Sequence, residues 1–156
     1  MRLALYCPEI PQNTGTLLRL GACVGVSVDI IEPCGFVISD RRLQRAGMDY
    51  IERSNYHLYS SWQAFTQAAL DQRLVLITTS ATQAYTDFHF GETDCLIVGQ
   101  ESCGFPQEIE SSISHQVMIP MAPGRRSLNV AIAAAMVLGE ALRQTQKYHS
   151  LTEHIS

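Results

Sequence analysis

A short apolar segment of this chain is followed by a loop whose residue types could hold a small molecule. Cys95–Val98 has the pattern of a buried strand, and Gly99, Glu101 and Gly104 follow it. Glycine lets a ligand approach the backbone closely, and a carboxylate can orient that ligand or a nearby arginine. An ordinary turn after a strand would use the same residue types. Both interpretations stay open from this loop alone.

A second strand and loop come later in the chain. A short strand is predicted at Val117–Ile119, followed by a Pro/Gly loop and the longest helical pattern, with Ser127 as its N-cap. Two strand ends that carry such loops, beside the start of a helix, are typical of a small-molecule pocket in an α/β sheet. The apolar stripe of the helical pattern favours a core or a dimer interface over ligand contact. Its residues are Leu128, Ala131, Ile132, Ala135, Leu138 and Leu142.

Several familiar active-site patterns do not fit these loops. Gly99 and Gly104 have the spacing of a P-loop, but no lysine follows. Ser102 lies in G-x-x-S-x-G, one residue too long for a nucleophile elbow. No G-x-G-x-x-G follows the first strand. A Cys103 nucleophile with His115 as its base is an alternative, but nothing in the sequence places the two together.

Arginines occur at two unusual places. Arg19 lies within a small, mainly apolar helical pattern, where it is either a snorkelling surface residue or a functional one. Arg41, Arg42 and Arg45 fall along one side of a predicted short helix that begins at Asp40. Such a row is usually a solvated face, but arginine also matches the geometry of phosphate oxygens. These residues therefore form a candidate phosphate-binding patch.

The elements that must position these residues alternate along the chain. Helices are predicted after Asn13 and Thr14, which can cap the first one, after Ser61, and at Pro106–Ser111. Strands are predicted at Arg2–Cys7, Ser27–Ile31, within Asp49–Tyr59, at Arg73–Thr78, Cys95–Val98 and Val117–Ile119, with a further extended piece at Tyr85–Phe90. Alternating strands and helices indicate an α/β fold with a mainly parallel sheet covered on both faces.

The composition indicates to which broad class of protein this chain belongs. The chain has 156 residues, 46% of them apolar, and a net charge of −4, which predicts one globular domain without a wholly basic surface. Five cysteines without a C-x-x-C pair indicate a reducing, cytoplasmic location. No metal site, signal peptide or membrane span is expected. The tail, residues 147–156, is expected to be frayed.

Three segments together resemble a known family. They are Pro11–Gly25, Leu96–Pro106 and Ile119–Met136, and they are similar to the three motifs of the SPOUT-class RNA 2′-O-methyltransferases. The segment Ile30–Tyr50 resembles the minimal members, the tRNA (cytidine/uridine-34) 2′-O-methyltransferases. The resemblance covers nearly the whole chain and implies a single domain, residues 1–156.

The resemblance implies a fold, a cofactor and an assembly. The fold is an α/β sheet with a deep C-terminal trefoil knot, over about residues 74–146. The assembly is a homodimer packed through the first and last helices. The cofactor is S-adenosylmethionine, which becomes S-adenosylhomocysteine. The residues implied to bind it are Ile77, Thr78, Thr79, Gly99, Glu101, Gly104, Ile119, Met121, Ser127 and Leu128.

The resemblance also implies a reaction, in which a ribose 2′-hydroxyl of the wobble nucleotide attacks the cofactor methyl. Arg19, Asn13 and Glu101 are the implied catalytic residues. The resemblance implies Arg19 as the base. Because a guanidinium stays protonated in proteins, the alternative is that Arg19 holds a phosphate and polarises the 2′-oxygen. The implied tRNA contacts are Arg41, Arg42, Arg45, Arg125 and Arg126. A non-catalytic RNA-binding or assembly factor with the same fold is the alternative, and the choice between C34 and U34 is open.

Overall fold

The computed structural model describes residues 1–38 and 56–148. The helix predicted from Asp40, with Arg41, Arg42 and Arg45, lies outside these residues. The described strands form one sheet in the order β3-β2-β1-β5-β4-β6, and every neighbouring pair is parallel. Their bounds are β1 Arg2–Tyr6, β2 Ser27–Ile31, β3 Tyr56–Tyr59, β4 Arg73–Ile77, β5 Asp94–Val98 and β6 His115–Val117. The predicted α/β architecture with a mainly parallel sheet is confirmed.

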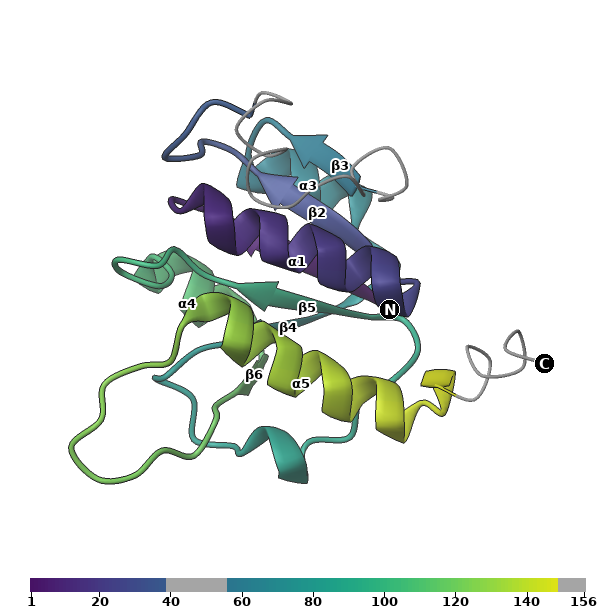
Figure 1. Cartoon of the computed structure of the whole chain (residues 1–156), viewed down its shortest axis with the longest axis vertical. Coiled ribbons are helices and arrows are strands. Elements are labelled where there is room, and N and C mark those ends of the chain that lie inside the picture. Colours follow the sequence, from purple (N-terminus) through teal and green to yellow (C-terminus); the bar gives the residue numbers. More distant parts are fainter. Residues whose placement is uncertain (39–55, 149–156) are drawn as a thin grey trace.

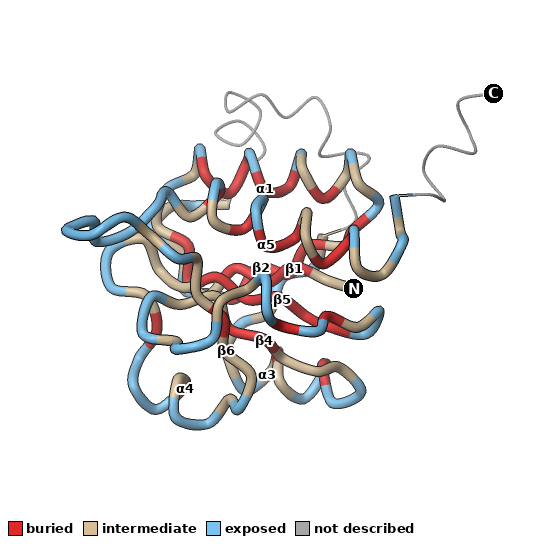
Figure 2. The backbone as a smooth tube through the Cα atoms, turned by 90° about the horizontal axis from the view of Figure 1, so that it is seen from below, coloured by how far each residue is buried: buried red, intermediate tan, exposed pale blue. Residues whose placement is uncertain are grey.

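Helices cover both faces of the sheet (Figure 1). The helices α1, Pro11–Val24, and α5, Val130–Gln144, pack side by side on one face. The shorter helices α3, Trp62–Ala68, and α4, Gln107–Ser112, lie on the other (Figure 2). Each face has its own apolar cluster, and all five residues of β5 between them are buried. The strand that precedes the glycine loop is therefore held rigidly.

The C-terminal end of α1 agrees with the prediction, and the N-terminal end does not. Gly25 ends the helix in the left-handed conformation, with φ of 67°, as predicted. The prediction that Asn13 or Thr14 caps the helix is wrong, because the helix begins at Pro11 and Ile10 precedes it without a side-chain cap. Proline suits the first helical position since its missing N–H would have no partner there. Asn13 and Thr14 are instead buried in the first turn.

The start of α5 also differs. Asn129 is the N-cap, and its Oδ1 accepts from Ala131 N at 2.9 Å and Ile132 N at 3.3 Å. The prediction of Ser127 as the cap is wrong, because Ser127 lies in the preceding loop. In the predicted stripe, Ala131, Leu138 and Leu142 are buried, but Leu128, Ile132 and Ala135 are exposed. The helix is apolar on nearly every side at its start, so hydrophobicity does not select the buried face.

Met118, the residue after β6, contacts the segment between β4 and β5. Met118 exchanges hydrogen bonds with the backbone of Gln83 and Tyr85, at 2.8 and 2.9 Å. The strand β6 therefore ends two residues before the predicted Ile119. The prediction of an extended piece at Tyr85–Phe90 is wrong for Tyr85–Asp87, which forms the 3₁₀ turn η2. Within the described ranges, no helix is long and apolar enough to cross a membrane.

Candidate active site

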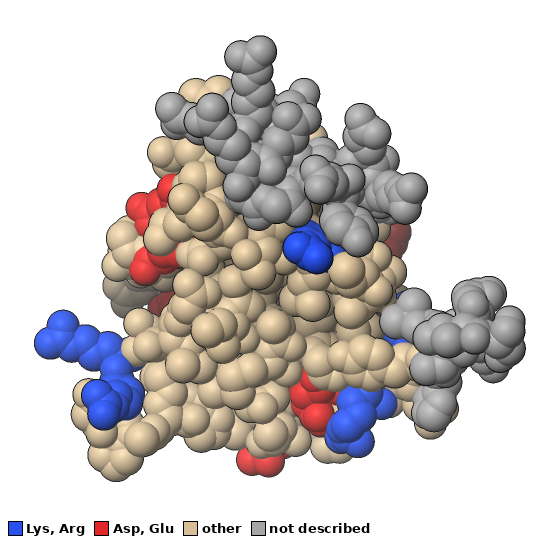
Figure 3. Space-filling view, in the orientation of Figure 1, with Lys and Arg blue, Asp and Glu red and all other residues tan. Residues whose placement is uncertain are grey.

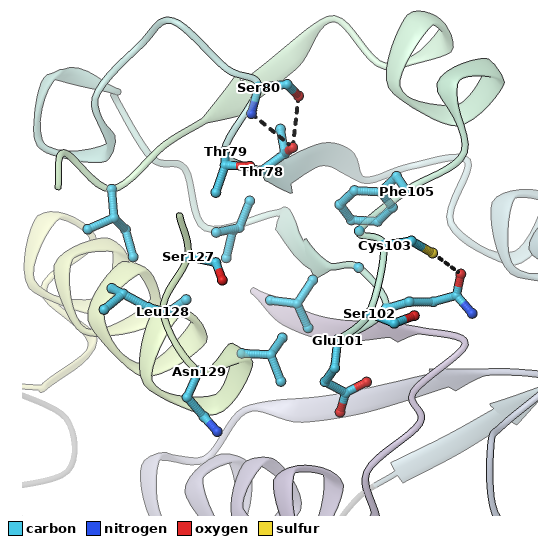
Figure 4. A pocket seen from close by; sticks show the side chains of 18 of the residues that line it. Thr78, Thr79, Ser80, Glu101, Ser102, Cys103, Phe105, Ser127, Leu128 and Asn129 are labelled. Atoms are coloured by element: carbon cyan, nitrogen blue, oxygen red, sulfur yellow. Dashed lines mark hydrogen bonds between the residues drawn. The ribbon is translucent and has the colours of Figure 1, made fainter. Parts of the chain in front are cut away.

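A cavity of about 610 Å³ opens at the carboxyl ends of β4 and β5 (Figure 4). These strands are parallel neighbours, so the loops that follow them meet at one edge of the sheet. The loop after β6 and the start of α5 complete the walls. Every residue predicted to bind the cofactor lines this cavity: Ile77, Thr78, Thr79, Gly99, Glu101, Gly104, Ile119, Met121, Ser127 and Leu128.

The glycine loop after β5 is a tight backbone ring. Gln100 N donates to Gly104 O at 2.8 Å, and Gly104 N donates back to Gln100 O at 2.9 Å. Gly104 has φ of 72°, which favours glycine. A Cβ at Gly99 would stand 2.6 Å from the carbonyl carbon of Gly104, so a side chain there cannot be accommodated without opening the ring. Both glycines are needed to give the cavity a wall made of backbone.

The carboxylate of Glu101 binds the start of α1. Its Oε2 accepts from Glu9 N at 2.8 Å, and its Oε1 accepts from Ile10 N at 3.3 Å and Asn13 Nδ2 at 3.2 Å. A carboxylate is favoured there because the first N–H groups of a helix carry partial positive charge. Glu101 thus fixes the glycine loop against α1.

Asn13 and Asn129 extend this network to α5. Asn129 Nδ2 donates to Asn13 Oδ1 at 3.0 Å, while Asn129 Oδ1 caps α5. The hydrogen bonds between Glu101 and Asn13 and between Asn13 and Asn129 therefore connect the loop after β5 with α1 and α5. Asn129, within the third motif of the resemblance, was given no catalytic or binding role by the prediction, although asparagine just before a helical pattern is a cap signal.

Glu9 was also missed. Its carboxylate accepts from Ser102 N at 2.8 Å and from Ser102 Oγ at 2.9 Å. Because Glu9 N also donates to Glu101, Glu9 and the consecutive loop residues Glu101 and Ser102 bind each other reciprocally. No local pattern gives this pairing, because the partners are 93 residues apart.

Another polar group lines the cavity beyond β4. Glu110 on α4 accepts from Thr78 Oγ1 at 2.7 Å and from Ser80 Oγ at 2.9 Å. Among the described residues that line the cavity, Glu101 and Glu110 are charged and no lysine, arginine or histidine is present. The cavity therefore suits a neutral or positively charged ligand better than an anionic one.

The predicted catalytic arginine lies elsewhere. Arg19 is exposed on α1 and does not line the cavity of its own chain, unlike Asn13 and Glu101. Arg125 and Arg126 are exposed on the loop between β6 and α5. Figure 3 shows basic side chains at the edge of the molecule where this loop lies. The structure thus brings Asn13 and Glu101 together with the cofactor-binding candidates, but not the arginines.

A cysteine hydrolase is not supported by this geometry. The Cys103 thiol donates to Gln100 Oε1 at 3.1 Å. His115 packs against the ring of Phe88, with centroids 6.0 Å apart, and does not line the cavity. Cys34 does not offer another nucleophile, because burial raises the pKa of its thiol to about 12 and the thiol stays protonated.

Comparison with known proteins matches nearly the whole of this chain to RNA methyltransferases. The SpoU rRNA Methylase family matches residues 1–139. The tRNA (cytidine(34)-2′-O)-methyltransferase of Beijerinckia indica is 55% identical over 144 residues, which cover 91% of this chain and 90% of that protein. A structure solved for the 2-OH methylation of C/U34 on tRNA is 37% identical, with a TM-score of 0.87, and the match covers 92% of this chain and 94% of that one.

A more distant structure shares the fold. The SpoU methyltransferase AviRb from Streptomyces viridochromogenes, in complex with the cofactor AdoMet, is 22% identical with a TM-score of 0.84. The match covers 92% of this chain and 60% of AviRb.

Proposed function

This chain belongs to the SpoU rRNA methylase family, and we propose that it is an S-adenosylmethionine-dependent tRNA methyltransferase that methylates the ribose 2′-hydroxyl of the wobble nucleotide, C34 or U34. The observation that carries this proposal is the 55% identity, over 91% of the chain, with a tRNA (cytidine(34)-2′-O)-methyltransferase. Such an enzyme processes tRNA in the cytoplasm, where its substrate is found.

The cavity fits the cofactor. Its volume of about 610 Å³ is within the range of small-molecule sites. Its walls combine the backbone of the glycine ring with apolar side chains, as an adenosine requires, and its carboxylates suit a cation. S-adenosylmethionine supplies a methyl group on a positively charged sulfur. The residues that hold it are the ten that were predicted to do so, from Ile77 to Leu128.

The chain's own residues contribute chiefly positioning. Glu101 uses both carboxylate oxygens on α1, so its role is to hold the glycine ring and Asn13 in place rather than to accept a proton. Asn13 in turn orients Asn129. Arg19 contacts the RNA, where its guanidinium holds a phosphate and polarises the 2′-oxygen.

The position of Arg19 outside its own cavity supports a homodimer through α1 and α5. The outward face of α5 exposes Ile132 by 55% and Met136 by 38%. Figure 3 shows few charges over this face. In the proposed dimer, Arg19 of one copy completes the cavity of the other. Large apolar side chains grouped on one surface favour such an interface.

The proposed trefoil knot, over about residues 74–146, has support in two contacts. Met118, after β6, is bonded to Gln83 and Tyr85. Gln144, at the end of α5, is bonded to Phe88 O at 3.0 Å and Phe90 N at 2.9 Å. The segment between β4 and β5 is therefore hydrogen-bonded both to the residue after β6 and to the last residue of α5.

The tRNA contacts of the proposal are basic. Arg125 and Arg126 are exposed beside the mouth of the cavity, in the loop that carries Met121 and Ser127. Arg41, Arg42 and Arg45 are the further contacts, from the sequence alone. An anticodon loop presents unpaired nucleotides to such a surface.

The test is methyl transfer from labelled S-adenosylmethionine to tRNA from a strain that lacks the gene, followed by nuclease digestion and mass spectrometry. A 2′-O-methylated pyrimidine at position 34 is expected.

Arg19→Ala should retain cofactor binding and lose transfer by at least about a hundredfold, as expected when a charged positioning group is removed. Arg143→Ala, which removes an exposed arginine paired with Glu140, is the control. Near-normal transfer by Arg19→Ala would contradict its role, and cofactor binding without any transfer would favour an RNA-binding factor.

A further inference from the structure

One carboxylate on the wall of the cavity lies outside the network of Glu101, Asn13 and Asn129. Glu110 comes from α4, on the opposite face of the sheet from α1 and α5. Its Oε1 accepts from the hydroxyls of Thr78 and Ser80, and these hydroxyls lie 2.9 Å apart. Figure 4 shows Thr78 and Ser80 across the cavity from Glu101 and Asn129. The group is thus a separate polar corner of the same cavity.

The second oxygen of this carboxylate is available to a ligand. None of the hydrogen bonds among the described residues uses Glu110 Oε2, whereas both oxygens of Glu101 are occupied by the start of α1. The described lining residues also include no basic side chain that could neutralise Glu110. The two hydroxyls fix the orientation of the carboxylate, so little ordering is left for a ligand to supply.

We infer that Glu110 is the subsite for the α-ammonium group at the aminoacyl end of the cofactor. This inference rests on the proposed function. A carboxylate binds a charged N–H donor more strongly than a neutral hydroxyl, and the ammonium is the charged N–H donor of S-adenosylmethionine. The sulfonium carries charge but no hydrogen to donate. Glu110 therefore distinguishes ligands that retain the aminoacyl end from adenosine compounds that lack it.

The test changes the charge and keeps the shape. Glu110→Gln retains an oxygen that can accept from Thr78 and Ser80, so the corner stays assembled. Binding is measured by calorimetry with S-adenosylmethionine, S-adenosylhomocysteine and 5′-methylthioadenosine, which lacks the aminoacyl end. A lost charge-assisted hydrogen bond is expected to weaken binding of the first two about tenfold. Binding of 5′-methylthioadenosine should change less than about twofold, because it has no ammonium group.

Glu108→Gln is the matched control. Glu108 lies on the same helix, is exposed and does not line the cavity, so its removal changes the net charge equally and should leave all three affinities unchanged. The inference is overturned if Glu110→Gln binds all three compounds normally, if it loses 5′-methylthioadenosine equally, or if it loses S-adenosylmethionine alone. If the wild-type protein binds none of them, the proposed function fails as well, so the two failures are distinguishable.

Discussion

Glu9 should control how tightly the cofactor is held, although its own carboxylate does not line the cavity. Glu9→Ala removes the acceptor for Ser102 N and Ser102 Oγ, at 2.8 and 2.9 Å. The backbone bond from Glu9 N to Glu101 is retained, because it does not involve the deleted side chain. The substitution therefore releases one side of the reciprocal contact and leaves the other.

The magnitude follows from these two bonds. Hydrogen bonds to a charged acceptor contribute about 1.5–3 kcal/mol when buried, and both of these are exposed, so we assign about 1 kcal/mol each. A loss of about 2 kcal/mol corresponds to about thirtyfold in affinity. That value is an upper limit, because Glu101 still anchors the ring to α1. We expect S-adenosylhomocysteine to bind about five- to thirtyfold more weakly.

Calorimetry on three variants tests this reasoning. Ser102→Ala removes the Oγ donor and keeps the N–H, so it should cost about half as much free energy as Glu9→Ala. Because the hydroxyl bond is already absent, adding Ser102→Ala to Glu9→Ala should weaken binding little further. Thermal unfolding of each variant shows whether the fold is intact. Unchanged affinity in Glu9→Ala, or fully additive losses in the double variant, would refute the role of Glu9 as a positioning residue.

Three further substitutions test other parts of the structure. Gly99→Ala should lower S-adenosylhomocysteine affinity by at least about tenfold, measured by calorimetry, because its Cβ would stand 2.6 Å from Gly104 and the ring bonds must break. Gln144→Ala should lower the free energy of unfolding by about 1–3 kcal/mol in urea titration, since Phe88 O and Phe90 N lose their partner. The control Gln63→Ala, at an exposed position of α3, should leave the free energy of unfolding unchanged. Gly139→Ala should raise the thermal midpoint by about 2–4 °C, because the nearest atom to the new Cβ is 3.6 Å away and alanine favours a helix. A lower midpoint would show that this face of α5 is already packed.

Local signals predicted the order of elements well. Gly25 ends α1 and Ser61 caps α3, with its Oγ 3.1 Å from Ala64 N. Both depend on backbone geometry within four residues. The wrong caps at Asn13 and Ser127 show where local reasoning fails, because each lies beside the true start of a helix and faces the cavity instead.

The cavity residues were predicted for a different reason. The pattern of strands predicted that the loops after Val98 and Ile119 form one pocket, but it did not place Ile77 there. The inclusion of Ile77 and the identity of the cofactor were implied by the resemblance of whole segments. Neither the local pattern nor the resemblance predicted the roles of Glu9 and Glu110. Their hydrogen-bond partners are 93 and 32 residues away, and the order of the strands decides whether they meet.

The position of β1 inside the sheet has a consequence for synthesis on the ribosome. Leu5 pairs with Ile30 of β2 on one side but with Val98 of β5 on the other. Once β3 is complete at Tyr59, a further 39 residues, 98 − 59, must be translated before β5 is complete. At about 5–20 residues per second this takes about 2–8 seconds, during which one edge of β1 is unpaired. An apolar edge left open for that time can pair with another nascent chain. Slow translation between β3 and β5 should therefore lower the yield of folded protein more than slow translation after β6.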